Sequence, residues 1–286
     1  MFATKKVAVD GLAREDIIPA TVDGILTDVV QTGPIRALQS RTGRIRPAPG
    51  GVSIGHRDIT AGTLGCLVKK DGQIFILSNN HVLANSNEAE LGDPILQPGP
   101  YDGGRLPEDH IANLEQFVPI SFSESSSNCP IAIGAANLFN AIVRILGSDS
   151  RLKAISVQAT DNLVDAAIAR PINIQDVTDQ ILEIGTIRGT TQGELGMAIK
   201  KSGRTTGLTT GEVLQVDVTV NVQYGEGKAA RFTDQLMAGP MSQGGDSGSA
   251  VLDETSCLMG LLFAGSDNST IINRIENVFS ALGVTI

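Results

Sequence analysis

Four valines at alternate positions most constrain what this chain can fold into. Val216, Val218, Val220 and Val222 are separated by polar residues. A side-chain period of two gives one apolar and one polar face, the pattern of a half-buried β-strand. Glycine makes up 32 of the 286 residues, more than the ~7% typical of soluble proteins, which implies many turns. The chain therefore favours an all-β architecture, and its length suffices for one large or two small cores.

Other segments predict further elements around this strand. A hairpin is expected from residues 62–68 and 73–77 across the turn 70–72, with a second strand of the valine hairpin near 229–237 and a buried strand over 258–263. Apolar residues at helical spacing predict an inserted helix near 135–146, expected to pack on the first half of the molecule, and a closing helix over 271–282. Residues 88–127 read as loop-rich, with a strand-like stretch at 117–120.

A serine set between glycines is the first candidate for chemistry. Ser247 lies in Ser242–Ser249, directly before an apolar run. Glycines let the backbone turn sharply, so the N–H groups of Gly245 and Ser247 can converge on one point as an oxyanion hole. The same residues also suit a glycine-rich turn before a strand. The motif alone does not separate these two interpretations.

A nucleophilic serine needs a base and a group that orients the base. The chain has three histidines, His56, His81 and His110, and only His81 directly follows an apolar strand-like run. Asp165 lies inside the apolar run 163–169, where a carboxylate is costly to bury without a hydrogen-bond donor. An imidazole N–H is such a donor. His81, Asp165 and Ser247 are thus candidates for one site, with Asp161 as the next candidate for the acid.

The motifs Asn-Asn-His-Val-Leu-Ala, Leu-Val-Asp-Ala-Ala-Ile-Ala and Gly-Gly-Asp-Ser-Gly-Ser, in this order, resemble those of chymotrypsin-like serine peptidases, above all bacterial trypsin-like members distantly related to the HtrA/Deg group. The resemblance spans roughly Gly51 to the C-terminus and implies a mostly β fold of two six-stranded antiparallel barrels. It implies peptide-bond hydrolysis through an acyl-enzyme. Ser247 would attack, His81 would transfer the proton, Asp165 would orient the imidazole, and the Gly245 and Ser247 N–H groups would hold the oxyanion.

The same resemblance places the substrate pocket. Met241, six residues before the nucleophile, would lie at its base, and Phe263 and Ala264 would belong to its wall. A thioether offers no charge to a bound lysine or arginine, so small or medium uncharged residues are expected before the cleaved bond. Asp267 is the competing feature, because a loop that carried it into the pocket would restore a preference for cations.

The charge balance limits the partners. The net charge of −9 and pI near 4.8 disfavour nucleic acid and anionic membranes, because both repel an acidic surface. No run is long enough to span a bilayer, and we expect no PDZ-like segment after the peptidase region. The expected partner is a polypeptide substrate, a homo-oligomer is left open, and no cofactor or metal is implied.

The cysteines bear on the compartment. Cys66, Cys129 and Cys257 are too few for a disulfide framework or a zinc site. In secreted members of the family, a disulfide would join the position of Cys66 to the residue after the histidine, which here is Val82. With that bridge missing and no apolar leader at the start, the expected location is the cytoplasm.

Residues 1–50 are expected to form a short regulatory region, with possible strands at 6–9 and 25–30, ahead of a peptidase domain over 51–286. Within that domain, barrel 1 is placed at about 58–170 and barrel 2 at about 185–286. The boundary follows a cluster of arginines, interpreted as solvated or acid-paired: Arg36, Arg41, Arg44 and Arg46. The segment 200–207 lacks the order of a phosphate-binding loop.

Two other functions compete with catalysis by a peptidase. A peptidase fold kept as a binding or scaffold module, with a closed site, is the main alternative. An esterase of the α/β-hydrolase fold is excluded, because its triad would run Ser, Asp, His and its serine would sit in Gly-x-Ser-x-Gly. Asp246, beside the nucleophile, is expected to bond local backbone N–H groups or a nearby cation.

Overall fold

The computed structural model divides the chain into two compact units, residues 1–40 and 41–286. It describes the ranges 2–3, 12–13, 17–28, 30–31, 40–59, 61–122, 124–126, 129–145, 152, 154–157, 161–225 and 228–286. The assignment of a separate role to residues 1–50 stays a prediction.

The first unit contains only short strands in its described part. β1 (Phe2–Ala3) pairs in parallel with β4 (Val30–Gln31), and β2 (Thr21–Val22) pairs antiparallel with β3 (Ile25–Leu26). Ile25 and Leu26 are 72% and 82% exposed, so this hairpin buries little apolar surface of its own. The strand expected at 6–9 lies outside the described residues.

The second unit begins with a seven-stranded sheet in the order β7-β6-β10-β11-β14-β9-β8. Its strands are β6 (Ser53–His56), β7 (Gly62–Thr63), β8 (Cys66–Lys70), β9 (Gln73–Ser78), β10 (Pro94–Leu96), β11 (His110–Phe117) and β14 (Ala167–Pro171). The expected hairpin is β8 and β9. Asp71 and Gly72 turn it with φ of 49° and 75°, the left-handed values of a tight two-residue turn.

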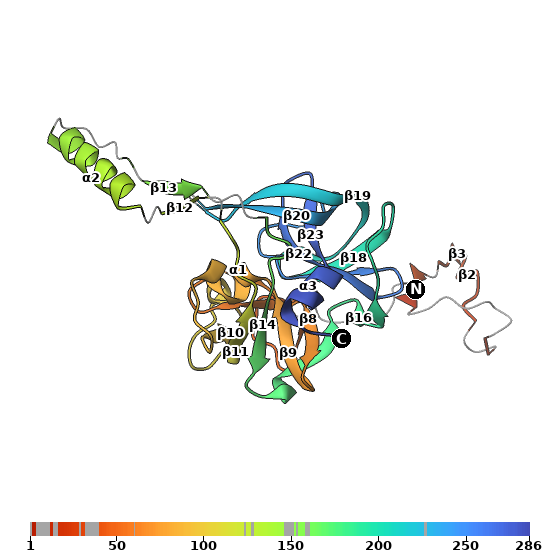
Figure 1. Cartoon of the computed structure of the whole chain (residues 1–286). Helices are drawn as coiled ribbons and strands as arrows, with labels where there is room; N and C mark the ends of the chain where they lie inside the picture. The colour runs from red at the N-terminus through yellow and green to blue at the C-terminus, as the bar shows by residue number, and fades with distance from the viewer. Residues whose placement is uncertain are drawn as a thin grey trace. The chain divides into compact units, whose positions relative to one another are not determined.

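A second seven-stranded sheet has the order β17-β22-β21-β18-β19-β20-β23, and β22 also pairs with β23. Its strands are β17 (Gly189–Thr190), β18 (Ala198–Gly203), β19 (Gly207–Gln223), β20 (Ala229–Ala238), β21 (Ala250–Asp253), β22 (Cys257–Gly265) and β23 (Thr270–Arg274). The alternating valines lie in β19, whose residues alternate between partly buried and exposed from Val216 to Gln223. Figure 1 shows the two sheets as separate layers that meet near α1 and β14.

The predicted fold class is confirmed: the chain is mostly β, with two large sheets. Each sheet has seven strands rather than the expected six, because a two-residue strand, β7 or β17, extends it. A third small sheet joins β5 (Ala48–Gly50), β15 (Val177–Ile181) and β16 (Gly185–Thr186). The interpretation of 88–127 as loop-rich was wrong for β10 and β11, which bury Ile95 and Ile111 fully.

The inserted helix is α2 (Pro130–Ile145), and a short ribbon of β12 (Glu124–Ser126) and β13 (Ile155–Val157) flanks it in sequence. Leu138 is 66% and Phe139 49% exposed, so the apolar stripe does not bury these side chains on the first barrel as expected. The closing helix begins later than predicted. Its first residues belong to β23, and α3 covers Ile275–Leu282.

Three short segments complete the described elements, η3 (Asn85–Asn87), η4 (Pro100–Asp102) and η5 (Ile174–Asp176). No helix among the described residues is long and apolar enough to cross a membrane. Cys66 and Cys257 are free cysteines. Burial raises the pKa of the Cys66 thiol to about 12, so this cysteine behaves as an apolar core residue.

The arginines ahead of β5 mostly find partners. Arg41 donates to Ser202 Oγ at 2.7 Å and pairs with Glu183, and Arg44 lies 3.3 Å from Asp109. Arg46 donates to Gln97. These contacts fit the acid-paired interpretation for Arg41 and Arg44, while Arg36 lies outside the described residues.

Candidate active site

His81 is positioned by the end of the first hairpin. It lies in α1 (Asn80–Leu83), one turn that follows β9 directly. Its Nδ1 is 2.6 Å from Asp165 Oδ2, and its backbone N–H donates to Asp165 Oδ1 at 3.2 Å. Asn79 donates to the Asp165 carbonyl at 2.7 Å. The sequence between β9 and α1 thus ties His81 to Asp165 through side chain and backbone.

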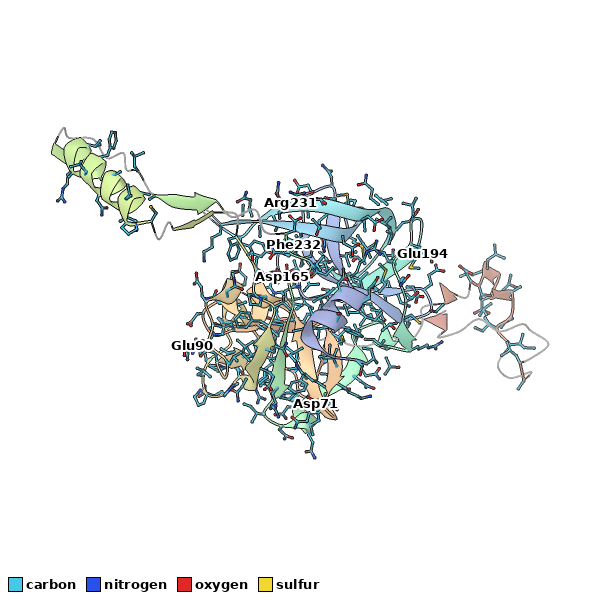
Figure 2. All side chains as sticks on the ribbon, in the orientation of Figure 1. Asp71, Glu90, Asp165, Glu194, Arg231 and Phe232 are labelled. Carbon is cyan, nitrogen blue, oxygen red and sulfur yellow. The ribbon has the colours of Figure 1, made fainter. Side chains whose placement is uncertain are left out.

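Asp165 is fully buried, two residues before β14, where the two sheets meet (Figure 2). Its backbone N–H donates to Asn273 Oδ1 at 2.9 Å, which connects the segment to β23 of the second sheet. Besides His81, its carboxylate accepts one further hydrogen bond among the described residues, from the Tyr224 hydroxyl to Oδ2 at 2.8 Å. Burial, followed by the charge of Asp165, raises the pKa of Tyr224 well above its usual value. The sequence analysis did not single out Tyr224, because no local pattern relates it to Asp165.

Ser247 lies in the loop before β21. Gly245 and Gly248 on either side have φ of 96° and 93°, values that favour glycine. The hydroxyl of Ser247 donates to the carbonyl oxygen of Phe263 at 3.3 Å, and the described residues show no hydrogen bond between Ser247 and His81. Both side chains nevertheless line one cavity of about 660 Å³. His81 and Ser247 therefore face the same cavity, and the serine hydroxyl is bonded to a different acceptor.

The loop before Ser247 turns the backbone N–H of Gly245 away from Thr205. The carbonyl of Gly244 accepts from Thr205 Oγ1 at 2.7 Å. In a planar trans peptide the next N–H points the opposite way, so the N–H of Gly245 faces away from Thr205. Within the described part of the chain, neither this N–H nor that of Ser247 has an acceptor. A Cβ at Gly245 would lie 2.5 Å from Thr205 Oγ1, so the close approach requires glycine.

The side chain of Asp246 anchors the same loop through an ion pair and several hydrogen bonds. It is fully buried and lies 3.1 Å from Lys201 Nζ, which is also fully buried. It accepts from the backbone N–H groups of Thr205 (2.8 Å), Thr206 (3.1 Å) and Gln243 (3.0 Å) and from Thr206 Oγ1 (2.6 Å). Burial alone would raise the pKa of Asp246, but the Thr206 hydroxyl and Lys201 outweigh it and leave that pKa below its usual value. The expected bonds to backbone and cation are confirmed.

Comparison with known proteins shows which fold this chain shares. No protein-family model matches the chain. Over 97 residues it is 38% identical to glutamyl endopeptidase 2 of Streptomyces griseus, covering 32% of this chain and 48% of that protein. The chain therefore spans about half the length of this curated relative.

Three solved proteases cover most of this chain. Thermobifida fusca protease A has a TM-score of 0.51 at 15% identity, over 83% of this chain and 96% of its own. Nocardiopsis protease has 0.53 at 14%, over 83% and 97%. A glutamic acid-specific serine protease that uses a histidine triad in substrate binding has 0.53 at 21%, over 84% and 100%. The chain has the fold of chymotrypsin-like serine proteases. The resemblance to bacterial trypsin-like proteases is thereby confirmed, whereas the HtrA relation stays a prediction.

Within this chymotrypsin-like fold, a second cavity of about 360 Å³ also borders Ser247. Ala264 lines both cavities and Phe263 the larger one. Met241 lines neither, contrary to the sequence-based expectation. It is buried in the core of the second sheet with Ile199 and Val213, because the chain turns there to give its backbone N–H to Thr270. Asp267 lines the smaller cavity instead.

The other two histidines and the second candidate acid have partners of their own. His56 is paired with Asp93 at 3.1 Å, and His110 bonds to Asn113 at 2.8 Å. Asp161, the second candidate for the acid, pairs with Arg231 at 3.3 Å and is 48% exposed. No cluster of histidine, cysteine and acidic side chains able to hold a metal occurs among the described residues.

Proposed function

We propose that the protein is a serine endopeptidase that hydrolyses peptide bonds through an acyl-enzyme. The observation that carries this proposal is the 2.6 Å contact between His81 Nδ1 and the buried Asp165, with His81 and Ser247 on one cavity. A carboxylate on Nδ1 holds the proton there and leaves Nε2 free to act as a base. The fold shared with serine proteases supports the same chemistry.

In the proposed reaction, Ser247 exchanges its bond to the Phe263 carbonyl for one to His81 Nε2. His81 takes the hydroxyl proton as the oxygen attacks the peptide carbonyl, and the N–H groups of Gly245 and Ser247 donate to the resulting oxyanion. His81 then gives the proton to the leaving amine, which breaks the C–N bond. Water, activated by the same imidazole, hydrolyses the acyl-enzyme and returns the serine.

Labelling with a fluorophosphonate tests the proposal, because this reagent modifies only an activated serine. We expect one label, located on Ser247 by mass spectrometry, and no label on the His81→Ala variant. His110→Ala is the matched control, since the His110 ring bonds to Asn113, and it should label like the parent. Intact folded protein that takes no label would favour the scaffold alternative, for which the bond from Ser247 to Phe263 is the supporting observation.

We further propose that the 360 Å³ cavity receives the side chain that precedes the cleaved bond. Asp267 is the charged residue among those that line this cavity. Met241 does not line it, so the thioether no longer supports a preference for uncharged side chains. A carboxylate at the wall attracts lysine or arginine and repels glutamate. We do not propose a histidine triad for substrate binding, such as the glutamic acid-specific protease uses, because the chain's three histidines are bound to Asp165, Asp93 and Asn113.

A peptide series varied only before the cleaved bond tests this specificity. We expect kcat/KM to rank lysine and arginine above alanine, valine and leucine, and glutamate last. The Asp267→Asn variant should narrow the difference between arginine and glutamate by at least about tenfold. Glu254→Gln removes another exposed acid that lies outside this cavity and should leave the ranking unchanged. A ranking that Asp267→Asn does not alter would contradict the assignment.

A further inference from the structure

Tyr224 forms a hydrogen bond with Asp165 of the candidate triad, and the reaction proposed above gives Tyr224 no role. Its hydroxyl donates to Asp165 Oδ2 at 2.8 Å, and the same oxygen lies 2.6 Å from His81 Nδ1. The other carboxylate oxygen accepts the 3.2 Å bond from the backbone of His81. Among the described residues, Tyr224 is therefore the one side chain besides His81 that bonds to this buried carboxylate.

The phenol ring is held by its neighbours. It packs edge-on against His81 at 5.7 Å and 71° and against Phe122 at 5.5 Å and 74°, and it lies 6.2 Å from the ring of Phe232. Its backbone N–H donates to the carbonyl of Lys228 at 2.8 Å across the turn between β19 and β20. Such edge-to-face contacts fix a ring without blocking its polar end. The hydroxyl is thus aimed at Asp165 by the hairpin and not by the loop that carries Ser247.

We propose that Tyr224 is a positioning residue for the triad: its hydroxyl orients the Asp165 carboxylate that in turn orients His81. This inference rests on the proposed peptidase function. With Oδ2 fixed by a donor on one side, its remaining lone pair faces His81 Nδ1–H, which turns Nε2 toward the cavity that Ser247 lines. Tyr224 touches neither the nucleophile nor the oxyanion donors, so its effect passes through Asp165.

The hydrogen bond also sets how strongly Asp165 attracts the charge that forms on His81. A phenol that donates to the carboxylate draws away part of its negative charge. The imidazolium is then held less tightly, which favours return of its proton to the leaving amine. The charged groups recorded next to Tyr224 are Asp165 itself and Lys228, whose Nζ lies 5.8 Å from the Phe122 ring and pairs with Glu88.

The Tyr224→Phe variant removes the hydroxyl and keeps the ring. We expect the rate of fluorophosphonate labelling and kcat to fall by about 10- to 100-fold, the range of one hydrogen bond to a charged group. KM should change little, because no substrate contact is lost. The acid limb of the kcat/KM profile should move to higher pH, since the carboxylate holds the imidazolium more tightly. Tyr101→Phe is the matched control, because Tyr101 is 72% exposed, and it should keep the parent profile.

A second measurement does not depend on catalysis. The chain has two tyrosines, so the absorbance of Tyr101→Phe reports Tyr224 alone. We expect its phenol to ionise well above pH 10 and to ionise at lower pH when Asp165→Asn is added, because the neighbouring negative charge is gone. Ionisation near pH 10 that ignores Asp165→Asn would overturn the inference, as would an active Tyr224→Phe with an unshifted profile. If the parent takes no label, the proposed function fails while this titration still tests the hydrogen bond.

Discussion

Two carboxylates near the candidate site, Asp165 and Asp246, are fully buried, and their charges are compensated in different ways. Asp246 faces a buried ammonium, Lys201, and accepts from three backbone N–H groups and a hydroxyl. Asp165 has no permanent cation among the described residues. Its side-chain partners are an imidazole and a phenol, neither of which carries a permanent charge.

Asp246 is therefore called the fixed carboxylate, because its charge is already balanced, and Asp165 the responsive carboxylate, because its charge is not. A carboxylate that already has a full counter-charge and several backbone donors gains nothing when a neighbour ionises, so the Asp246 region holds the loop in one conformation. A carboxylate with neutral donors is poised to stabilise a positive charge that appears on His81 during the reaction. We therefore expect changes at Asp165 to affect rate, and changes around Asp246 to affect mainly stability.

The largest expected effect tests the responsive carboxylate. Asp165→Asn keeps the shape but removes the charge and favours the wrong tautomer of His81. Turnover should fall by about 10⁴-fold, the size of this change in the chymotrypsin-type triad. The measurement is kcat at neutral pH, alongside denaturation to confirm folding.

Asp161→Asn is the control for that experiment, since this acid is half exposed and paired with Arg231. It should retain turnover within about twofold. A loss of less than tenfold for Asp165→Asn would show that the acid was wrongly chosen.

The next effect tests the fixed carboxylate. Lys201→Met leaves Asp246 buried without its cation, which should lower the free energy of unfolding by about 3–5 kcal/mol. Urea denaturation followed by circular dichroism measures this. Lys200→Met is the matched control, because Lys200 bonds to Ser256 and the Glu254 carbonyl near the surface, and it should cost under about 1 kcal/mol. Equal losses for the two variants would remove the distinction between the two carboxylates.

A smaller effect tests whether the loop anchored by Asp246 influences the rate of the proposed reaction. Thr205→Val releases the Gly244 carbonyl, so the N–H of Gly245 is no longer directed toward the oxyanion position. We expect about a tenfold fall in kcat, less than the loss of a whole oxyanion donor. Thr209→Val, which removes a 2.8 Å bond to the Met241 carbonyl, should leave kcat unchanged. A Thr205→Val variant with the parent's kcat would mean that this hydroxyl does not set the loop.

The smallest effect is on acid stability. The pKa of Asp246 is lower in the folded protein than its usual value, so the folded state binds this proton less readily than the unfolded chain. The stability that this carboxylate contributes is present above about pH 4 and is lost as the pH falls through its folded pKa. Between pH 6 and pH 3, the double variant Lys201→Met, Asp246→Asn should therefore lose less stability than the parent in urea denaturation. A parallel loss would contradict the ion-pair argument.

Local pattern predicted most of the elements that matter for the site. The alternation around Val218, the β8–β9 hairpin and the strand at 258–263 follow from side-chain period and turn residues, which act between near neighbours. Strands β10 and β11 were missed because β10 is only three residues long and begins with a proline, and β11 mixes polar with apolar residues. Both become strands only when paired in the sheet. The start of the closing helix was misjudged for the same reason, since 270–274 pair with β20 and β22.

By itself, the sequence selected His81, Asp165 and Ser247 as candidates for one site, because a nucleophilic serine needs a base and an acid that orients the base, and His81 and Asp165 follow or lie within apolar runs. Tertiary structure decided the partners. Tyr224 reaches Asp165, Lys201 reaches Asp246 and Asp267 reaches the cavity beside Ser247 across separations of 59, 45 and 20 residues. Met241, which the family resemblance placed in the pocket, packs in the core instead. Contacts of this kind depend on how two sheets meet in space, and no local pattern along the chain encodes that distance.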